Sequence, residues 1–399
     1  MQFTVTSGHV QDHASSLLRS HLRLHDYKES CPVSTLLAVL FCACARLCSF
    51  FAAGRRLKHA PSHETLRKAL HDNLPDIDEL QRRLNCALAA LVSPSLRRHF
   101  RTKRKLGRGL TIAIDLNLRP YHGVHDDDDL EVVRGQAKSG TTHFHAYATA
   151  YVVLRGQRFT LAMRRVQKGE KMDVVVRDLL RRCAQLDVPI GVVLLDRGFF
   201  SVAVIRYLQA ARYHFLMPVI TRGRKPTHPD GVGGTRIFQT WNCGGFSQYT
   251  IQESAKNGRR ARVGICVWVR NRNGRRGKHG RERLVYAYWG WQPRSVRQVR
   301  ETYRQRFGIE SSYRQLGEAK AKTCTRSAAV RLLLVGVALV LRNIWVWLHH
   351  EILSSPRRGK RLYNWERLRF KDLLLWLQHE AEKALGLNDE VCTERAMPP

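Results

Sequence analysis

The hydrophobic pattern in the first part of the chain is helical. Residues 1–106 contain no convincing strand alternation, and in the segment 61–70 the apolar residues Leu66 and Leu70 lie four positions apart, behind a serine that suits a helix N-cap. This basic segment fits the second helix of a helix-turn-helix, and it fits equally well an ordinary amphipathic helix with a solvated basic face. The basic run 97–108 then predicts a linker. Residues 1–106 are therefore expected to form a helical N-terminal domain.

After this run the pattern changes to short apolar stretches typical of buried strands. Strands are predicted over 109–118, 144–154, 157–165, 190–195 and 213–219, and helices over 172–187 and 200–211. Three strands, a helix, a strand, a helix and a strand, in this order, resemble the RNase H-like fold. The resemblance implies an α/β architecture, with a mixed sheet and flanking helices, in which the first and fourth strands are neighbours.

The following segment breaks this pattern, because it is rich in glycine, arginine and asparagine. It has β-like patches at 236–241, 247–252, 261–269 and 283–289, which predict a small β insertion before the next helical segment. Helical periodicity returns at 295–321, continues through 328–348, and is followed by a polar tail with a helix at 364–384. The expected segments are a helical domain at 1–106, the first part of the core at 107–220, the β insertion at 221–290, the second part of the core at 291–350 and a helical tail at 351–399.

The charge of the chain narrows the choice of partners. It has 68 Lys+Arg against 33 Asp+Glu, a formal net charge of +35. Nucleic acids carry negative charge at a matching density, so this balance favours salt-dependent binding to double-stranded DNA through phosphate contacts. The helical domain is then expected to bind DNA. Charge alone also fits a ribosome-associated protein without catalysis.

Two long apolar runs do not change this interpretation. The runs 35–53 and 332–348 are interrupted by Arg46 and by Arg342, so neither offers about 18 uninterrupted apolar residues. Both are predicted to be buried helices, with no membrane as partner. The start of the chain is polar, which is not typical of a signal peptide, and the expected location is the cytoplasm, on the DNA of the nucleoid. The ten cysteines lack the spacing of a zinc site or a disulfide framework and are predicted to be small buried hydrophobic residues.

Three acidic residues stand out in this basic chain. Asp115 lies in the apolar run 111–116, Asp196 follows the strand 190–195, and Glu310 lies in a helical segment. Carboxylates at strand ends are suitable ligands for Mg²⁺, and a pair of such ions catalyses phosphodiester cleavage. Each acid also has a purely structural alternative. These are a strand residue capped by a basic partner for Asp115, a helix N-cap for Asp196 and a surface salt bridge for Glu310.

The surroundings of the second and third acids resemble a known family. Tyr303, Arg306 and Glu310 match, position by position, the Tyr-x₂-Arg-x₃-Glu-x₆-Lys signature of the insertion-sequence DDE transposases. The turn Asp-Arg-Gly-Phe at 196–199 resembles the second-acid motif of that family, and Gly198 is expected to permit a tight backbone path there.

The resemblance departs from the family at one position. The signature lysine is replaced by Gly317, and Arg314 or Lys320 is expected to contact DNA in its place. By the same resemblance, Tyr303 and Arg306 contact DNA phosphate near the element end. The three acids hold Mg²⁺, for which Mn²⁺ can substitute, and the protein acts on transposon ends and target DNA as a homodimer.

Three functions follow from these expectations. The first is a DNA transposase that cleaves strands at transposon ends and transfers them into target DNA. The second is a standalone nuclease on the same RNase H-like core, and the third is a domesticated DNA-binding protein without catalysis. The resemblance covers roughly residues 107–348 with all three acids intact, which argues against the third. The β insertion and the Tyr-Arg-Glu helix favour the first.

Overall fold

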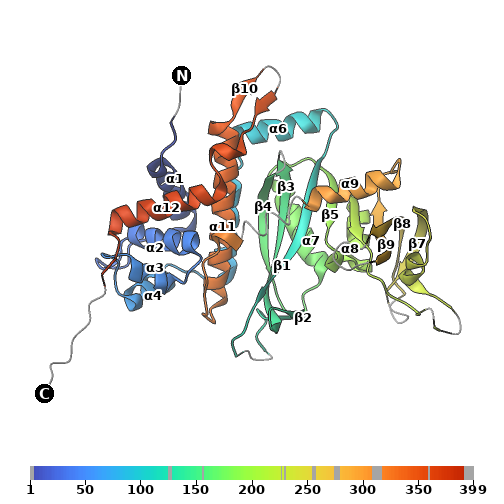
Figure 1. The fold of residues 1–399 in the computed structure, drawn as a ribbon, viewed down its shortest axis with the longest axis horizontal. Helices are drawn as coiled ribbons and strands as arrows, with labels where there is room; N and C mark the ends of the chain where they lie inside the picture. Colours follow the sequence, from blue (N-terminus) through green and yellow to red (C-terminus); the bar gives the residue numbers. More distant parts are fainter. Residues whose placement is uncertain are drawn as a thin grey trace. The chain divides into compact units, whose positions relative to one another are not determined.

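The chain forms two compact units. The structure, a computed structural model, describes residues 4–124, 128–154, 157–225, 227–228, 231–253, 258–273, 279–307, 317–357 and 360–390 (Figure 1). A helical unit comprises Met1–Ser93 with Tyr313–Pro399, and a sheet unit comprises Pro94–Ser312. The residues after Ser312 thus group with the N-terminal helices rather than with the sheet.

The helical unit is built around one long apolar helix. This helix, α11 (Ala328–Leu348), packs against α5 (Ile77–Ala90), and Gly336 makes the approach close, since a Cβ there would lie 2.5 Å from Leu84. The other elements are α1 (Ser7–Leu22), α2 (Val33–Arg46), α3 (Phe50–Arg56), α4 (His63–Asp72), α12 (Phe370–Leu385), the turns η4 (His349–Leu353) and η5 (Trp365–Arg367), and the strands β10 (Ser355–Arg357) and β11 (Lys360–Leu362).

Apolar burial accounts for both long hydrophobic runs of the sequence. The segment Ala328–Leu353 is long and apolar enough to cross a membrane, but 89% of its most apolar window is buried inside the protein, as in a core helix. Arg342, which interrupts the run, is 2% exposed, and its guanidinium lies 4.2 Å from the ring centroid of Trp345. In the second run, α2, the buried Cys42 and Cys44 pack as small apolar groups, and burial raises the pKa of Cys44 to about 12.

Two other expectations in this unit have clear outcomes. Ser62 caps α4 as predicted, because its side chain accepts a hydrogen bond from the backbone N–H of Thr65, and Leu66 and Leu70 face the core. The helix predicted at 364–384 in the C-terminal tail is also confirmed, as α12 over Phe370–Leu385, and one face of it is buried against α1 and α2.

The sheet unit holds a nine-stranded sheet with helices packed on it (Figure 1). Its strands are β1 (Leu110–Pro120), β2 (Val133–Lys138), β3 (Thr141–Leu154), β4 (Gln157–Val166), β5 (Ile190–Leu195), β6 (His214–Pro218), β7 (Gly245–Gln252), β8 (Arg260–Asn273) and β9 (His279–Trp289). Its helices are α6 (Pro94–Lys105), α7 (Met172–Gln185), α8 (Val202–Ala210) and α9 (Val296–Phe307), with short 3₁₀ turns η1 (Arg197–Phe199) and η2 (Gly234–Gln239).

The strand order confirms the expected mixed α/β architecture. The sheet runs β2-β3-β1-β5-β6-β9-β8-β7, and β4 pairs with β3. Within it, β4, β3 and β1 are antiparallel, and β1, β5 and β6 are parallel. The first and fourth predicted strands, β1 and β5, are therefore neighbours, as the RNase H-like resemblance implied.

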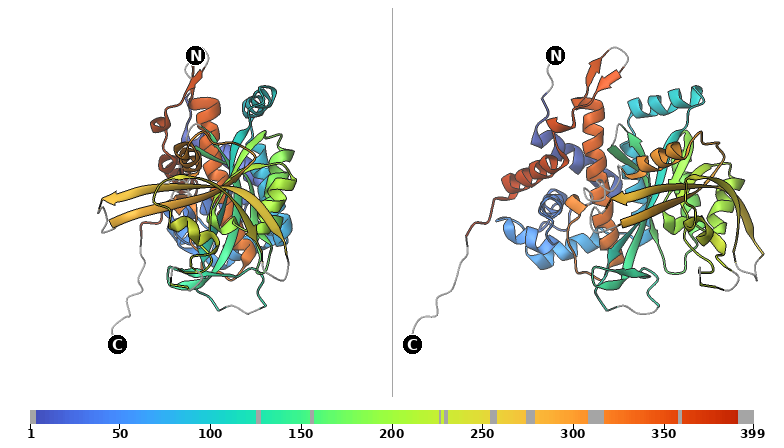
Figure 2. Two further views of the ribbon diagram at one scale, coloured as in Figure 1. Left: turned by 90° about the vertical axis from the view of Figure 1, so that its right-hand side faces the viewer. Right: turned by 45° about the vertical axis from the view of Figure 1, so that its right-hand side comes forward.

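The structure corrects several element assignments. The basic run 97–108 is mostly the helix α6, because Leu96 and Phe100, four residues apart, are both buried. The strand predicted at 236–241 is instead the 3₁₀ turn η2. The strand β2 was not predicted, because its residues are mostly exposed and polar. The β-rich segment does not stand apart, since β9 pairs with β6 and extends the main sheet with β8 and β7 (Figure 2).

Candidate active site

Two neighbouring parallel strands bring Asp115 and Asp196 to the same corner of the sheet. Ile114 on β1 is paired with Leu195 on β5, and each aspartate directly follows its member of this pair. Asp115 is 5% exposed, whereas the side chain of Asp196 is 40% exposed. The corner thus has one buried carboxylate and one that solvent reaches.

A pair of glycines sets the spacing of these two strands at their beginning. A Cβ on Gly109 would lie 2.1 Å from the Cα of Gly191, and a Cβ on Gly191 would lie 2.7 Å from the carbonyl carbon of Gly109. No side chain fits between the two backbones, so the close approach of β1 and β5 requires glycine at both positions. The glycine that the sequence pattern singled out, Gly198, has open space around its Cβ position and no left-handed φ. The expected tight turn is present as the 3₁₀ turn η1, but it does not require glycine at position 198, and the close approach of two backbones lies at the other end of β5.

The helix α9 places one arginine against both carboxylates. Arg306 Nη2 donates to Asp115 Oδ1 at 3.0 Å and lies 3.3 Å from Asp196 Oδ1. Arg306 Nη1 donates to the hydroxyl of Tyr303 at 3.0 Å, and that hydroxyl donates to the carbonyl of Leu195 at 3.3 Å. Tyr303 and Arg306 lie one turn apart on α9, so the helix is joined to the ends of both strands.

Burial and charge act in opposite directions on Arg306. Burial alone would lower its pKa, but the neighbouring Tyr303, Asp115 and Asp196 outweigh this effect and raise the pKa further above its ordinary value. The guanidinium is therefore held as a permanent cation between the two carboxylates. Burial also raises the pKa of Tyr303, which keeps its hydroxyl protonated and able to donate.

The carboxylate oxygens of Asp115 and Asp196 that are not hydrogen-bonded match the ligand preference of Mg²⁺. Asp115 Oδ1 accepts from Arg306 and from the backbone N–H of Leu116, and Asp196 Oδ1 accepts from the N–H of Arg197. The second oxygen of each carboxylate accepts no hydrogen bond within the described part of the chain. Hard carboxylate oxygens with room for water are what Mg²⁺ takes. Among described residues no group of three His, Cys, Asp or Glu side chains forms a metal site, and Glu310 lies outside the described residues.

Four of the residues expected from the sequence thus converge, namely Asp115, Asp196, Tyr303 and Arg306. Glu310 and Arg314 fall in the segment 308–316, outside the described residues, and Lys320 belongs to the helical unit. The structure also tests the purely structural roles that the sequence allowed for Asp115 and Asp196.

The helix-cap alternative for Asp196 applies only to the short turn η1, since its side chain accepts from the N–H of Arg197 while Ser201 caps the helix α8. The structural alternative for Asp115 was a strand residue capped by a basic partner, and Arg306 is such a partner. A single structural ion pair, however, does not call for a second carboxylate on the same guanidinium.

A buried arginine behind Asp115 was not predicted. Thr149 on β3 is the cross-strand partner of Asp115, and its hydroxyl accepts a hydrogen bond from Arg158 Nη2. Arg158 is 4% exposed, and its guanidinium lies 3.8 Å from the ring centroid of Tyr151. A charged residue near the start of the mostly apolar run 157–163 was the signal available in the sequence.

Comparison with known proteins shows the family of the chain. Residues 117–342, more than half of the chain, match the model of a family described as the transposase DDE domain, a range that contains Asp196, Tyr303, Arg306 and Glu310. No curated protein matches the chain. Among solved structures, the chain is similar to the piggyBac transposase in a synaptic complex with hairpin DNA. The TM-score is 0.46 and the identity 11%, over 96% of this chain and 80% of that one.

Proposed function

The chain belongs to the transposase DDE domain family, and on that premise we propose that its transposase reaction is Mg²⁺-dependent DNA strand cleavage and strand transfer at the sheet corner around Asp115 and Asp196. The observation that carries this proposal is the convergence of these two carboxylates with Arg306, at 3.0 and 3.3 Å, at the ends of adjacent parallel strands. Glu310, seven residues after Tyr303, completes the proposed set of acids.

The proposed role of the acids is to hold Mg²⁺, which supplies activation of the attacking oxygen and stabilisation of the leaving oxygen when bound. Mn²⁺ is the expected substitute. Asp115 is fixed by its buried position and by the N–H of Leu116, whereas Asp196 is open to solvent, where a DNA strand can approach. Because each acid is one of few protein ligands, the loss of any one removes a large part of the site.

Arg306 and Tyr303 have distinct roles in this proposal. The planar guanidinium of Arg306 orients both carboxylates, and its fork suits a DNA phosphate when DNA binds. Tyr303 is 2% exposed, and its hydroxyl is hydrogen-bonded to Arg306 and to the carbonyl of Leu195. We therefore assign Tyr303 a positioning role, through Arg306, in place of the direct phosphate contact that the sequence suggested.

The partner in this proposal is double-stranded DNA, bound by a homodimer in the cytoplasm. The charge of +35 supports it, because phosphate neutralisation by Lys and Arg releases counterions from DNA. Arg314 and Lys320 remain the proposed replacements for the signature lysine. A standalone nuclease would use the same corner but would form no joined product.

The test is cleavage and joining of DNA by three variants, Asp115→Asn, Asp196→Asn and Glu310→Gln. The substrate is duplex taken from the DNA that flanks the coding region, with a supercoiled plasmid as target and Mg²⁺ present. Each variant is expected to lose cleavage while its affinity for the duplex, measured by fluorescence anisotropy, stays within about twofold, because single carboxylates contribute little to phosphate binding. Asp187→Asn is the matched control, since Asp187 is an exposed carboxylate of the same unit.

Two outcomes would contradict the proposal. Cleavage at the wild-type rate by one of the three variants would remove that residue from the metal site. Efficient cleavage by the wild-type protein without any joined plasmid product would favour the standalone nuclease.

A further inference from the structure

Asp115 shares one face of the sheet with a buried row of side chains on β3. It is paired with Thr149, and two positions along the strands Ala113 is paired with Tyr151. Directly opposed residues of an antiparallel pair lie on the same face, with Cβ atoms about 5 Å apart, and every second residue of a strand shares that face. Thr149 and Tyr151 are both buried. The immediate neighbours of Asp115 on this face are therefore enclosed by the protein.

A bulge in β4 turns a charged side chain toward the same face. The strands β3 and β4 change register by one residue just before Tyr151, which leaves Leu161 as an extra residue of β4. Beyond this bulge Arg158 is paired with Val153, which shares the face of Tyr151. In the register before the bulge, Arg158 would be opposite the next residue of β3 and would face the other side of the sheet. The bulge thus re-aims this arginine, as bulges beside active sites do.

The side chain of Arg158 runs along β3 toward Asp115. Its guanidinium lies 3.8 Å from the ring centroid of Tyr151, and its Nη2 donates to the hydroxyl of Thr149. Because Thr149 is the cross-strand neighbour of Asp115, the guanidinium and the Asp115 carboxylate lie about 12 Å apart or less. At an effective dielectric constant of about 20, opposite charges at about 12 Å change an equilibrium about tenfold.

We propose that Arg158 is a positioning residue of the catalytic corner, which holds Thr149 beside Asp115 and supplies a fixed positive charge to that carboxylate. The proposal rests on the proposed function, in which Asp115 is a metal ligand. Arg306 contacts the same carboxylate directly, but its guanidinium is also the group proposed to meet a DNA phosphate. Arg158 is buried and cannot reach DNA, so Asp115 keeps one positive charge nearby while Arg306 engages the substrate.

A double-mutant cycle tests this coupling without any catalysis. The unfolding constant of the full chain is measured in urea and EDTA for Arg158→Gln, for Asp115→Asn and for the double variant. Arg158→Gln is expected to raise the unfolding constant about tenfold less when Asp115 has been replaced, since the charge that Arg158 stabilises is then absent. Arg158→Lys keeps the charge and is expected to have the same effect in both backgrounds within about twofold.

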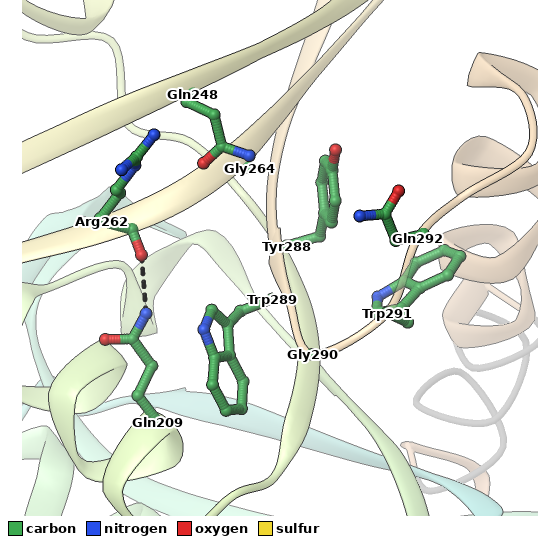
Figure 3. Close-up of a pocket in the computed structure, with 9 residues that line it drawn as sticks. All are labelled: Gln209, Gln248, Arg262, Gly264, Tyr288, Trp289, Gly290, Trp291 and Gln292. Atoms are coloured by element: carbon green, nitrogen blue, oxygen red, sulfur yellow. Dashed lines mark hydrogen bonds between the residues drawn. The ribbon is translucent and has the colours of Figure 1, made fainter.

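Two variants of the sheet unit are matched controls. Arg164 is a half-buried arginine of the same strand, but it is paired with Ala148 before the bulge, and its guanidinium donates to the carbonyl of Val174 on α7. Gln209, at the C-terminal end of α8, lines a hollow of about 860 Å³ and donates to a carbonyl of β8 (Figure 3). Arg164→Gln and Gln209→Ala are each expected to be additive with Asp115→Asn within about twofold.

The same role is measured in catalysis through Thr149. Thr149→Val removes the hydroxyl that accepts from Arg158, and it is expected to lower kcat for duplex cleavage about tenfold while KM stays within about twofold. Thr149→Ser keeps the hydroxyl and is expected to recover most of the kcat. A role in stability alone would lower the urea midpoint of Thr149→Val and leave the kcat of the folded protein unchanged. Should Arg158→Gln not fold, this pair of variants decides.

Two outcomes would overturn the proposal. One is additivity of Arg158→Gln and Asp115→Asn within about twofold, and the other is a wild-type kcat in Thr149→Val. Failure of the proposed function is distinguishable from both. Duplex cleavage by the wild-type protein together with an additive cycle rejects the role of Arg158 alone, whereas a coupled cycle without any cleavage by the wild-type protein rejects the proposed catalysis.

Discussion

Replacing Arg306 by glutamine is expected to destabilise the metal-free protein and to tighten its binding of metal. The guanidinium is shared by a buried carboxylate, Asp115, and by Asp196, whose side chain is 40% exposed. Removing one partner of a buried ion pair costs roughly 3–5 kcal/mol, and an exposed pair is worth about 1 kcal/mol or less. Because half of this cluster is open to water, we expect Arg306→Gln to lower the free energy of unfolding by about 3 kcal/mol.

The effect on metal affinity has the opposite sign. In the wild-type protein a divalent cation on the free oxygens competes with the guanidinium for the same two carboxylates, and a hydrogen bond to a charged group is worth about 1.5–3 kcal/mol. Losing one such contact on metal binding weakens the affinity by about tenfold. Arg306→Gln removes this competition, so it is expected to bind Mn²⁺ about tenfold more tightly while cleaving DNA far more slowly.

Two measurements check this reasoning. Urea unfolding in the presence of EDTA gives the metal-free stability, and a loss of about 3 kcal/mol corresponds to a midpoint lower by roughly 1–1.5 M. Calorimetric titration with Mn²⁺ gives the affinity. Arg304→Gln, an exposed arginine on the same helix, is the control and is expected to change neither value. Arg306→Lys keeps the charge but loses the planar fork, so we expect a large loss of cleavage and a modest loss of DNA binding. Unchanged metal affinity together with unchanged stability in Arg306→Gln would refute the bridging role.

Two further predictions concern the fold around the site and the helical unit. Gly191→Ala is expected to lower stability by about 1–3 kcal/mol and to slow cleavage, because its Cβ would lie 2.7 Å from the backbone of Gly109, just before β1. Gly198→Ala, with open space around it, is expected to cost less than about 0.5 kcal/mol in urea unfolding. Burial lowers the pKa of His349, so below about pH 6.5 the unfolded chain binds a proton that the folded protein does not, and stability is expected to fall as the pH drops below 6.5. His349→Gln should flatten this part of the pH profile and the exposed His71→Gln should not; equal profiles would contradict this assignment.

The parts of the fold that the sequence predicted well are those with a purely apolar signal. The strand β5 was located at its observed bounds, because six apolar or small residues in a row fit only a buried element. The helix α6 was not predicted, because its two buried residues, Leu96 and Phe100, are surrounded by six Lys and Arg residues that suggest a linker. The union of β7–β9 with the main sheet was also missed, since the pairing of β9 with β6 joins residues about 70 positions apart and leaves no local pattern.

In the site, too, local sequence patterns identified the residues but did not predict the contacts between residues far apart in the sequence. Asp115 and Asp196 were identified because a charged residue beside an apolar run is costly to bury, and Tyr303 and Arg306 because their spacing matches a family signature. The observed contacts of Arg306 with the two aspartates join residues 191 and 110 positions apart, a distance that helical periodicity does not address.

The two aspartates together are hard to explain by stability alone. Asp115 needs a cation because it is buried, and one arginine satisfies it. Asp196 adds a second negative charge 3.3 Å from the same guanidinium, its side chain is 40% exposed, and an asparagine would accept the backbone hydrogen bond from Arg197 as well. A second carboxylate at this corner therefore repels the first without a matching gain in packing. Such an arrangement is expected where the negative charge serves to bind a cation, and Arg306 offsets the repulsion while no such cation is bound.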